Sequence, residues 1–249
     1  LSNYTDPHDP ALIVTGTEYT RANINANGST NGLPATPDAT HNGLAIASMA
    51  LGAGFIEVRS GFAVRLALAD PGHADWQRDL SVSCVGIGDV LVAQGNLPEA
   101  LKAYRDGLAI AERLAQADPG NAGWQRDLSV SYEKIGDVRM AQGNLPEALK
   151  TYGDGLAIRE RLAQADPGNA GWQHDLSVSY AKIGTLSRKT GDRANALKAL
   201  GEGQTIMAHL TQVSPDNAQW QQDLIWFNKE ISELNRSSAR SNRRASSRR

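Results

Sequence analysis

Residues 118–165 read DPGNAGWQRDLSVSYEKIGDVRMAQGNLPEALKTYGDGLAIRERLAQA, and closely related stretches stand before and after them. Residues 70–117 and residues 166–213 align with this stretch at a spacing of 48 residues, without insertions. The first two copies share 38 of 48 residues, and the last two share 26 of 48. Residues 214–235 begin a fourth copy on the same period. A fixed period of this kind predicts a tandem array of similar structural units.

Each copy is predicted to form two helices. In the middle copy, apolar and aromatic residues recur at steps of three and four, which indicates one face of a helix over residues 122–142. These residues are Trp124, Leu128, Tyr132, Ile135 and Val138. Gly143 ends this helix, and Asn144 with Glu147 resembles the capping box of a second helix. The second helix is lined by Leu145, Leu149, Tyr152, Leu156 and Leu162, and ends before the turn at 167–168.

Glycines recur inside the predicted helices at fixed repeat positions. They are Gly88, Gly136 and Gly184 in the first helices, and Gly107, Gly155 and Gly203 in the second helices. A glycine inside a helix costs about 1 kcal/mol relative to alanine, so its regular use predicts close approach of two helices. One hairpin also has more apolar faces than its two helices cover, which predicts that successive hairpins stack.

The copies resemble the tetratricopeptide repeat family. The residues that carry the resemblance in the middle copy are Tyr132, Ile135-Gly136, Gly143, Ala148, Tyr152 and Gly155. The resemblance covers residues 70–213 and implies an all-α fold, in which tandem helical hairpins stack as a right-handed α-solenoid. The 48-residue period exceeds the family's usual length of about 34. The second-helix proline is displaced as well, and the added length is similar to that of kinesin light chain repeats.

The two ends of the chain differ from the repeats. Residues 43–69 are predicted to be a degenerate helical repeat, because Arg65-Leu66-Ala67 echoes Arg113-Leu114-Ala115. Residues 1–42 are rich in Asn, Thr, Gly and Pro, and we expect them to be disordered. Residues 214–235 are predicted to form a capping helix with a polar outer side, followed by a basic disordered tail at 236–249.

The sequence predicts no catalytic residue, no cofactor and no metal site, so we do not expect an enzyme. Cys84 occupies the repeat position of Tyr132 and Tyr180, which indicates a packing residue rather than a nucleophile. No pair of histidines has metal-ligand spacing. The longest apolar run, residues 44–56, is too short to cross a bilayer. The single cysteine gives no reason to invoke an oxidising compartment, and we expect a cytoplasmic protein.

The resemblance implies that the first helices line a groove for a peptide or helix of a partner protein. The helical wheel places candidate groove residues opposite the apolar stripe. They are Val82, Val85, Asp89 and Val92 in the first copy, Val130, Glu133, Asp137 and Met140 in the second, and Lys182, Arg188 and Lys189 in the third. This face passes from apolar to basic, which predicts a ligand with an apolar portion followed by an acidic one. The alternative is that the valines pack and the charges are solvated surface.

The leading interpretation is therefore a protein–protein interaction scaffold, and two alternatives stay open. Because the chain starts at Leu1, it could be the regulatory repeat arm of an enzyme or signalling protein whose catalytic domain is absent from this chain. Six arginines in residues 236–249 could instead bind nucleic acid. Against that, residues 1–235 carry about −8, and the tail has no aromatic residue. Self-association through residues 43–69 is expected if Phe55, Ile56 and Phe62 are exposed.

Overall fold

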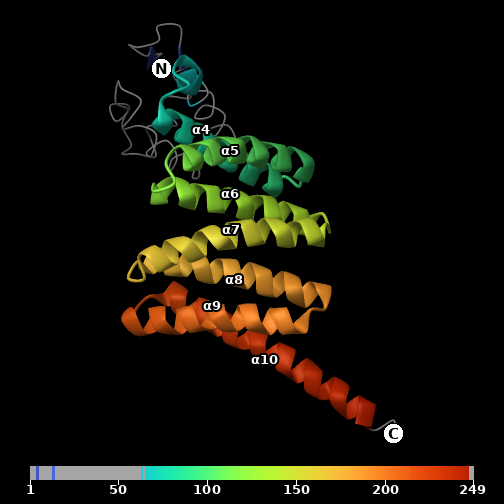
Figure 1. Cartoon of the computed structure of the whole chain (residues 1–249). Helices are drawn as coiled ribbons and strands as arrows, with labels where there is room; N and C mark the ends of the chain where they lie inside the picture. The colour runs from blue at the N-terminus through green and yellow to red at the C-terminus, as the bar shows by residue number, and fades with distance from the viewer. Residues whose placement is uncertain (1–3, 6–12, 15–62, 64, 247–249) are drawn as a thin grey trace. The chain divides into compact units, whose positions relative to one another are not determined.

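The computed structural model describes residues 4–5, 13–14, 63 and 65–246 (Figure 1). Two short strands, β1 (Tyr4–Thr5) and β2 (Ile13–Val14), pair in antiparallel fashion. The described chain then continues as helices α4 (Ala74–Ala93), α5 (Leu97–Ala117), α6 (Ala122–Ala141), α7 (Leu145–Ala165), α8 (Ala170–Thr190), α9 (Arg193–Val213) and α10 (Ala218–Ser246). The starts of corresponding helices recur every 48 residues, so the predicted all-α fold of tandem helical hairpins is confirmed.

The first helix of each pair starts at a repeated polar cap. The residue before the helix accepts a hydrogen bond from the backbone N–H of a tryptophan three positions later, which satisfies one of the free donors at the helix start. The donor–acceptor distances are 3.4 Å for Trp76 to His73, and 3.1 Å for Trp124 to Asn121, Trp172 to Asn169 and Trp220 to Asn217. The tryptophan spacing therefore marks where each hairpin begins.

The turn inside each hairpin uses a left-handed glycine. Gly95 and Gly143 have φ of 77°, and Gly191 has φ of 83°, a region that favours glycine over residues with a side chain. The capping box predicted after this turn in the middle copy was wrong. The Asn144 side chain makes no cap hydrogen bond, and the Glu147 carboxylate instead pairs with Arg139 at 3.3 Å.

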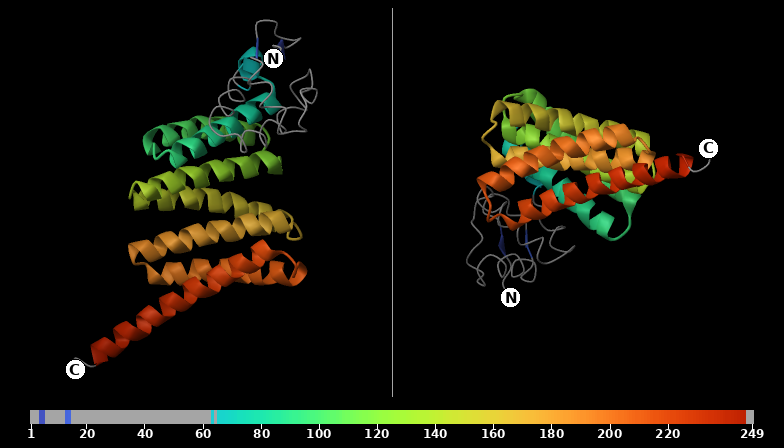
Figure 2. Two further views of the ribbon diagram at one scale, coloured as in Figure 1. Left: turned by 180° about the vertical axis from the view of Figure 1, so that it is seen from behind. Right: turned by 90° about the horizontal axis from the view of Figure 1, so that it is seen from below.

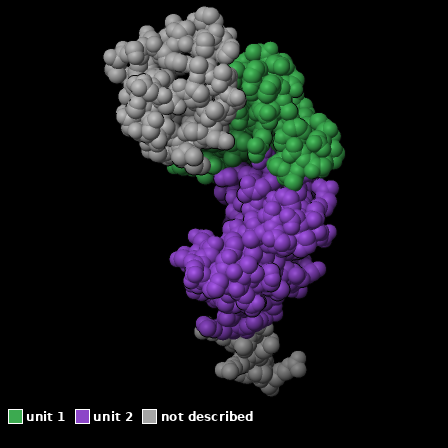
Figure 3. Space-filling model, turned by 90° about the vertical axis from the view of Figure 1, so that its left-hand side faces the viewer, with its two compact units in different colours: residues 1–124 green, residues 125–249 purple. Residues whose placement is uncertain are grey.

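The chain divides into two compact units, residues 1–124 and residues 125–249 (Figure 3). In unit 1, α4 packs against α5 as one hairpin. In unit 2, helices α6 to α10 pack in chain order, each against the next (Figure 2). The largest buried cluster of unit 2 lies between α9 and α10 and contains Ala196, Leu200, Met207, Leu210, Phe227 and Leu234. This unit holds two complete hairpins and the start of a third.

The repeated glycines lie where two helices approach closely, as predicted. A Cβ atom added to Gly136 would lie 2.4 Å from the Tyr152 ring, and one added to Gly184 would lie 2.6 Å from Leu200. At Gly155 the nearest atom would be the carbonyl oxygen of Ser129, at 3.2 Å. These distances are shorter than van der Waals contact, so the helix backbones of each hairpin pack directly against large side chains of the partner helix.

We predict opposite effects for two glycine-to-alanine changes in the same hairpin. Gly136→Ala should lower the free energy of unfolding by about 1–3 kcal/mol, because the new methyl group displaces Tyr152. Gly153→Ala should raise it by about 0.5–1 kcal/mol, because alanine favours the helix and no atom lies within 4 Å of the new Cβ. Urea unfolding followed by circular dichroism measures both. Destabilisation of similar size in both variants would contradict the packing role of Gly136.

Most of the predicted N-terminal segments lies outside the described residues. Ala63 and residues 65–69 are helical, whereas the other residues of the predicted degenerate repeat at 43–69 are not described. For the same reason, self-association through that segment stays a prediction. In the segment 1–42, only β1 and β2 are described, and their pairing differs from the expected disorder at those four residues.

The C-terminal helix is longer than predicted. The sequence predicts a capping helix that ends at residue 235 and a disordered tail at 236–249, whereas α10 continues to Ser246. The helix therefore extends past residue 235 into the arginine-rich segment. Residues 218–246 contain neither glycine nor proline, the two residues that interrupt a helix most strongly.

The inner face of α10 packs as predicted, whereas its outer face is less polar than predicted. Phe227 and Leu234 are buried against α9, with Trp220, Leu224 and Ile231 packed around them. On the outer face, Ile225 and Trp226 are 65% and 36% exposed. The outer side of the cap is therefore less polar than expected.

Candidate functional site

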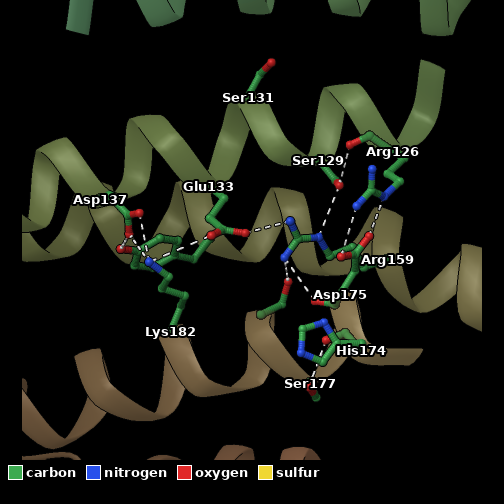
Figure 4. A network of polar contacts seen from close by, with 12 residues as sticks. Arg126, Ser129, Ser131, Glu133, Asp137, Arg159, His174, Asp175, Ser177 and Lys182 are labelled. Atoms are coloured by element: carbon green, nitrogen blue, oxygen red, sulfur yellow. Dashed lines mark hydrogen bonds and ion pairs between the residues drawn. The ribbon is translucent and has the colours of Figure 1, made fainter. Parts of the chain in front are cut away.

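A buried arginine joins three helices of unit 2. Arg159 of α7 is only 4% exposed, and burying a charge is costly unless it is paired and hydrogen-bonded. Its guanidinium lies 2.6 Å from the Glu133 carboxylate of α6 and donates to the Ser129 hydroxyl at 3.2 Å. It also donates to the Asp175 carbonyl at 3.0 Å and to the Ser179 hydroxyl at 2.9 Å, both on α8 (Figure 4).

A second ion pair lies beside the arginine. The Lys182 ammonium of α8 is 2.7 Å from Asp137 and 3.8 Å from Glu133, both on α6. Asp137 also accepts a hydrogen bond of 2.5 Å from the hydroxyl of Tyr152. Burial, this hydrogen bond and the charges of Asp137 and Glu133 raise the pKa of Tyr152 above its ordinary value, so the hydroxyl remains a donor. Two acids and two bases therefore neutralise one another between α6, α7 and α8 (Figure 4).

The members of this polar network change together between the copies. Glu133 and Arg159 correspond to Val85 and Ala111 in the first copy, and to Ala181 and Met207 in the third. Likewise Arg139 donates to Thr151 at 2.7 Å, whereas the first copy has Leu91 and Ala103 at these positions. The Tyr152–Asp137 bond recurs as Tyr104–Asp89 at 2.6 Å, and both partners are replaced in the third copy, by Leu200 and Thr185. The sequence analysis missed Arg159, although these paired differences were a signal for it.

The structure places most of the predicted groove residues in packing or ion pairs. Glu133, Asp137 and Lys182 come together, but they bind one another rather than forming an open face. Arg188 pairs with Glu230 and, at 3.3 Å, with Glu233 of α10. Lys189 is exposed and has no ion pair with any described residue. Two of the three basic residues that suggested an acidic ligand are thus already neutralised.

The remaining predicted groove residues do not form one described surface. Val82, Val85 and Asp89 are half-buried on α4, and Val92 is exposed near its end. Val130 is half-buried on α6, and Met140 packs against the cluster of Ala148, Tyr152 and Leu186. None of the eleven predicted residues lines the open pocket between α7, α8 and α9. The first-helix groove therefore stays a prediction.

Cys84 and His174 have surroundings that indicate a role in the fold. Cys84 is half-buried, and its burial, followed by the charge of Asp106, raises the thiol pKa to about 11. A thiol with that pKa is protonated at neutral pH and is a poor nucleophile, in agreement with a packing role. The imidazole of His174 lies 2.9 Å from Asp223, whereas Arg126, at the same position one copy earlier, lies 2.5 Å from Asp175. His174 thus occupies the place of a salt-bridging arginine.

An open pocket of about 530 Å³ lies between α7, α8 and α9. Its apolar lining comes from Leu149, Leu156, Ile183 and Ala199, and Leu149 is 43% exposed. Its polar lining consists of Glu160, Tyr180, Ser187, Thr190, Asp192, Asn195, Lys198 and Glu202. On α8, Tyr180 and Ile183 occupy the repeat positions of Tyr132 and Ile135, which belong to the apolar stripe predicted for the middle copy. In the structure, Tyr180 and Ile183 form part of an accessible hollow large enough for a side chain of a partner.

Comparison with known proteins agrees with the repeat pattern. Residues 82–119 match the family described as Tetratricopeptide repeat. The predicted resemblance of the copies to the tetratricopeptide repeat is therefore confirmed. No curated protein matches the sequence.

Several solved structures are similar to this chain at low identity. BtubC from P. vanneervenii is 16% identical, over 75% of this chain and 89% of that chain, with a TM-score of 0.37. Kinesin light chain TPR-like repeats from Podosopora anserina are 13% identical, over 89% and 95%, with a TM-score of 0.38. A de novo designed helical repeat protein is 9% identical, over 73% and 92%, with a TM-score of 0.31. At such TM-scores none of them supports an argument about function.

Two further properties concern only the described part of the chain. None of its described helices is long and apolar enough to span a bilayer. Within residues 65–246 and the few described residues before them, no three His, Cys, Asp or Glu side chains gather where they could hold a metal ion.

We predict strong coupling between Glu133 and Arg159. Glu133→Ala alone should lower the free energy of unfolding by about 3–5 kcal/mol, because it leaves the buried arginine without its carboxylate. Arg159→Met alone should cost about 2–3 kcal/mol, because Glu133 loses its closest cation while keeping partial exposure. The double variant installs the apolar pair of the third copy and should lie within about 1 kcal/mol of the native protein.

Urea unfolding of the native protein, both single variants and the double variant completes the thermodynamic cycle. Additive losses in the double variant would show that Glu133 and Arg159 do not stabilise the fold as a pair.

Proposed function

We propose that this chain is a protein–protein interaction scaffold that binds a segment of a partner protein in the pocket between α7, α8 and α9. Tetratricopeptide repeats generally serve as scaffolds for protein–protein interaction. The observation that carries the proposal is the open pocket of about 530 Å³ with an accessible apolar lining. A large apolar side chain exposed inside a hollow is a common feature of surfaces that bind partners.

The pocket is favoured over the groove predicted from the first helices. Its apolar residues Leu149, Leu156 and Ile183 line a hollow surface, whereas Glu133, Asp137 and Lys182 are occupied with one another. Binding at the pocket therefore requires no ion pair of unit 2 to break. Arg188 and Lys189 lie outside this pocket, so charge reversal at both positions should leave binding there unchanged.

We predict that Leu149→Asp weakens peptide binding by about tenfold or more, because burying one leucine contributes about 1.5–3 kcal/mol. The probes are peptides selected from a random displayed library against the native chain, and fluorescence anisotropy measures their dissociation constants. The matched control is Ile225→Asp, since Ile225 is also an exposed large apolar residue but lies on α10, outside the pocket.

The two variants distinguish binding in the pocket from nonspecific binding to any exposed apolar residue. Equal loss of binding in both, or selected peptides that ignore Leu149→Asp, would show that the pocket is not the binding site. Circular dichroism of each variant verifies that the helices are intact.

A further inference from the structure

The polar lining of the pocket carries an excess of negative charge. Glu160 lies on α7, Asp192 caps α9, and Glu202 lies on α9, whereas Lys198 is the one cation among the residues that line the pocket. Three carboxylates thus face one ammonium group.

The carboxylates are not neutralised by neighbouring cations. Asp192 is partly satisfied, because it accepts hydrogen bonds from the backbone and side-chain nitrogens of Asn195 at 3.1 Å and 2.5 Å. Glu160 accepts one hydrogen bond, of 2.9 Å, from the Tyr180 hydroxyl. Neither Glu160 nor Glu202 is within ion-pair distance of a cation among the described residues of unit 2. This contrasts with Glu133 and Asp137, whose charges are met by Arg159 and Lys182.

Glu160 and Glu202 both lie close enough to Tyr180 for their charges to affect its hydroxyl. Burial of Tyr180, the hydrogen bond to Glu160 and the negative charges of Glu160 and Glu202 raise the pKa of its hydroxyl. Both carboxylates therefore contribute to the potential beside the apolar lining. A negative potential next to an apolar hollow favours a ligand that combines a positive charge with an apolar group.

We propose that the occupant of the pocket is a partner segment in which one large apolar side chain stands next to lysine or arginine. The apolar side chain contacts Leu149, Leu156 and Ile183, and the cation lies near Glu160 and Glu202. This inference rests on the proposed function and names the chemistry of the partner. It differs from the acidic ligand expected from the sequence, because the basic residues behind that expectation are largely paired within unit 2.

The arginine-rich end of a second copy fits the pocket less well than such a segment. Residues 236–249 supply the positive charge, but they consist only of Arg, Ser, Ala and Asn. They contain no large apolar side chain for the apolar lining. A synthetic peptide of residues 236–249 is therefore a useful comparison in the test.

Four synthetic peptides of similar length test the proposal with the full chain, by fluorescence anisotropy at low ionic strength. The first has one leucine flanked by lysines, the second has the leucine flanked by glutamates, the third has alanine between lysines, and the fourth is residues 236–249. We expect the first peptide to bind most tightly and each of the others to bind about tenfold more weakly. Added salt should weaken the binding of the first peptide, because dissolved ions screen the attraction between exposed charges.

Glu202→Lys should raise the dissociation constant of the first peptide about tenfold, since it replaces an attractive charge with a repulsive one. Asp154→Lys is the matched control, because Asp154 occupies the same repeat position one copy earlier and does not line this pocket. The control should bind the first peptide as the native chain does.

The outcomes separate the partner chemistry from the proposed function. If the glutamate-flanked peptide binds as tightly as the lysine-flanked one, and Leu149→Asp abolishes both, the pocket binds peptides but the cationic preference is overturned. If the peptide of residues 236–249 binds as tightly as the first peptide, the requirement for a large apolar side chain is overturned, and a second copy of the chain becomes the occupant. Failure of all four peptides to bind the folded chain would overturn the partner chemistry, while library peptides sensitive to Leu149→Asp would still support the proposed function.

Discussion

The close approach of two helix backbones within each hairpin is the constraint on which the rest of the structure depends. At Gly136 and Gly184 the missing side chain leaves room for Tyr152 or Leu200, and no larger residue could stand there without displacing that side chain. The same arrangement recurs in unit 1, where Gly88 faces Tyr104. Because this contact fixes how the helices of a hairpin lie against each other, it also fixes which side chains can meet across them.

The polar network of unit 2 is a consequence of that fixed geometry. With Tyr152 held against Gly136, its hydroxyl reaches Asp137, and the buried guanidinium of Arg159 reaches Glu133. The charges of the network are thus balanced within unit 2. The pocket lined by Glu160 and Glu202 lies elsewhere on the same helices and leaves its carboxylates without an ionic partner among the described residues.

Much of the fold was predictable from the sequence, because its determinants are local or periodic. The turn glycines mark where the first helix of each hairpin ends, and the regular interior glycines indicated close packing. The site was harder to predict. A helical wheel places Glu133 and Asp137 on one face of α6, but it cannot show that Arg159 and Lys182 from two other helices reach that face. It also cannot show that Tyr180 and Ile183 line an accessible hollow rather than a closed core.

Glu133 and Arg159 are both replaced by apolar residues in the first copy, and this limits how the array of repeats can be shortened by recombination. Recombination between nearly identical coding stretches could join the first helix of one copy to the second helix of the next. Joining α4 to α7 would set Val85 in the place of Glu133 while keeping Arg159, so the hybrid would bury a guanidinium with no carboxylate beside it. The two helices of one copy are therefore not freely exchangeable, and we expect a shortened gene that separates Glu133 from Arg159 to encode a less stable fold.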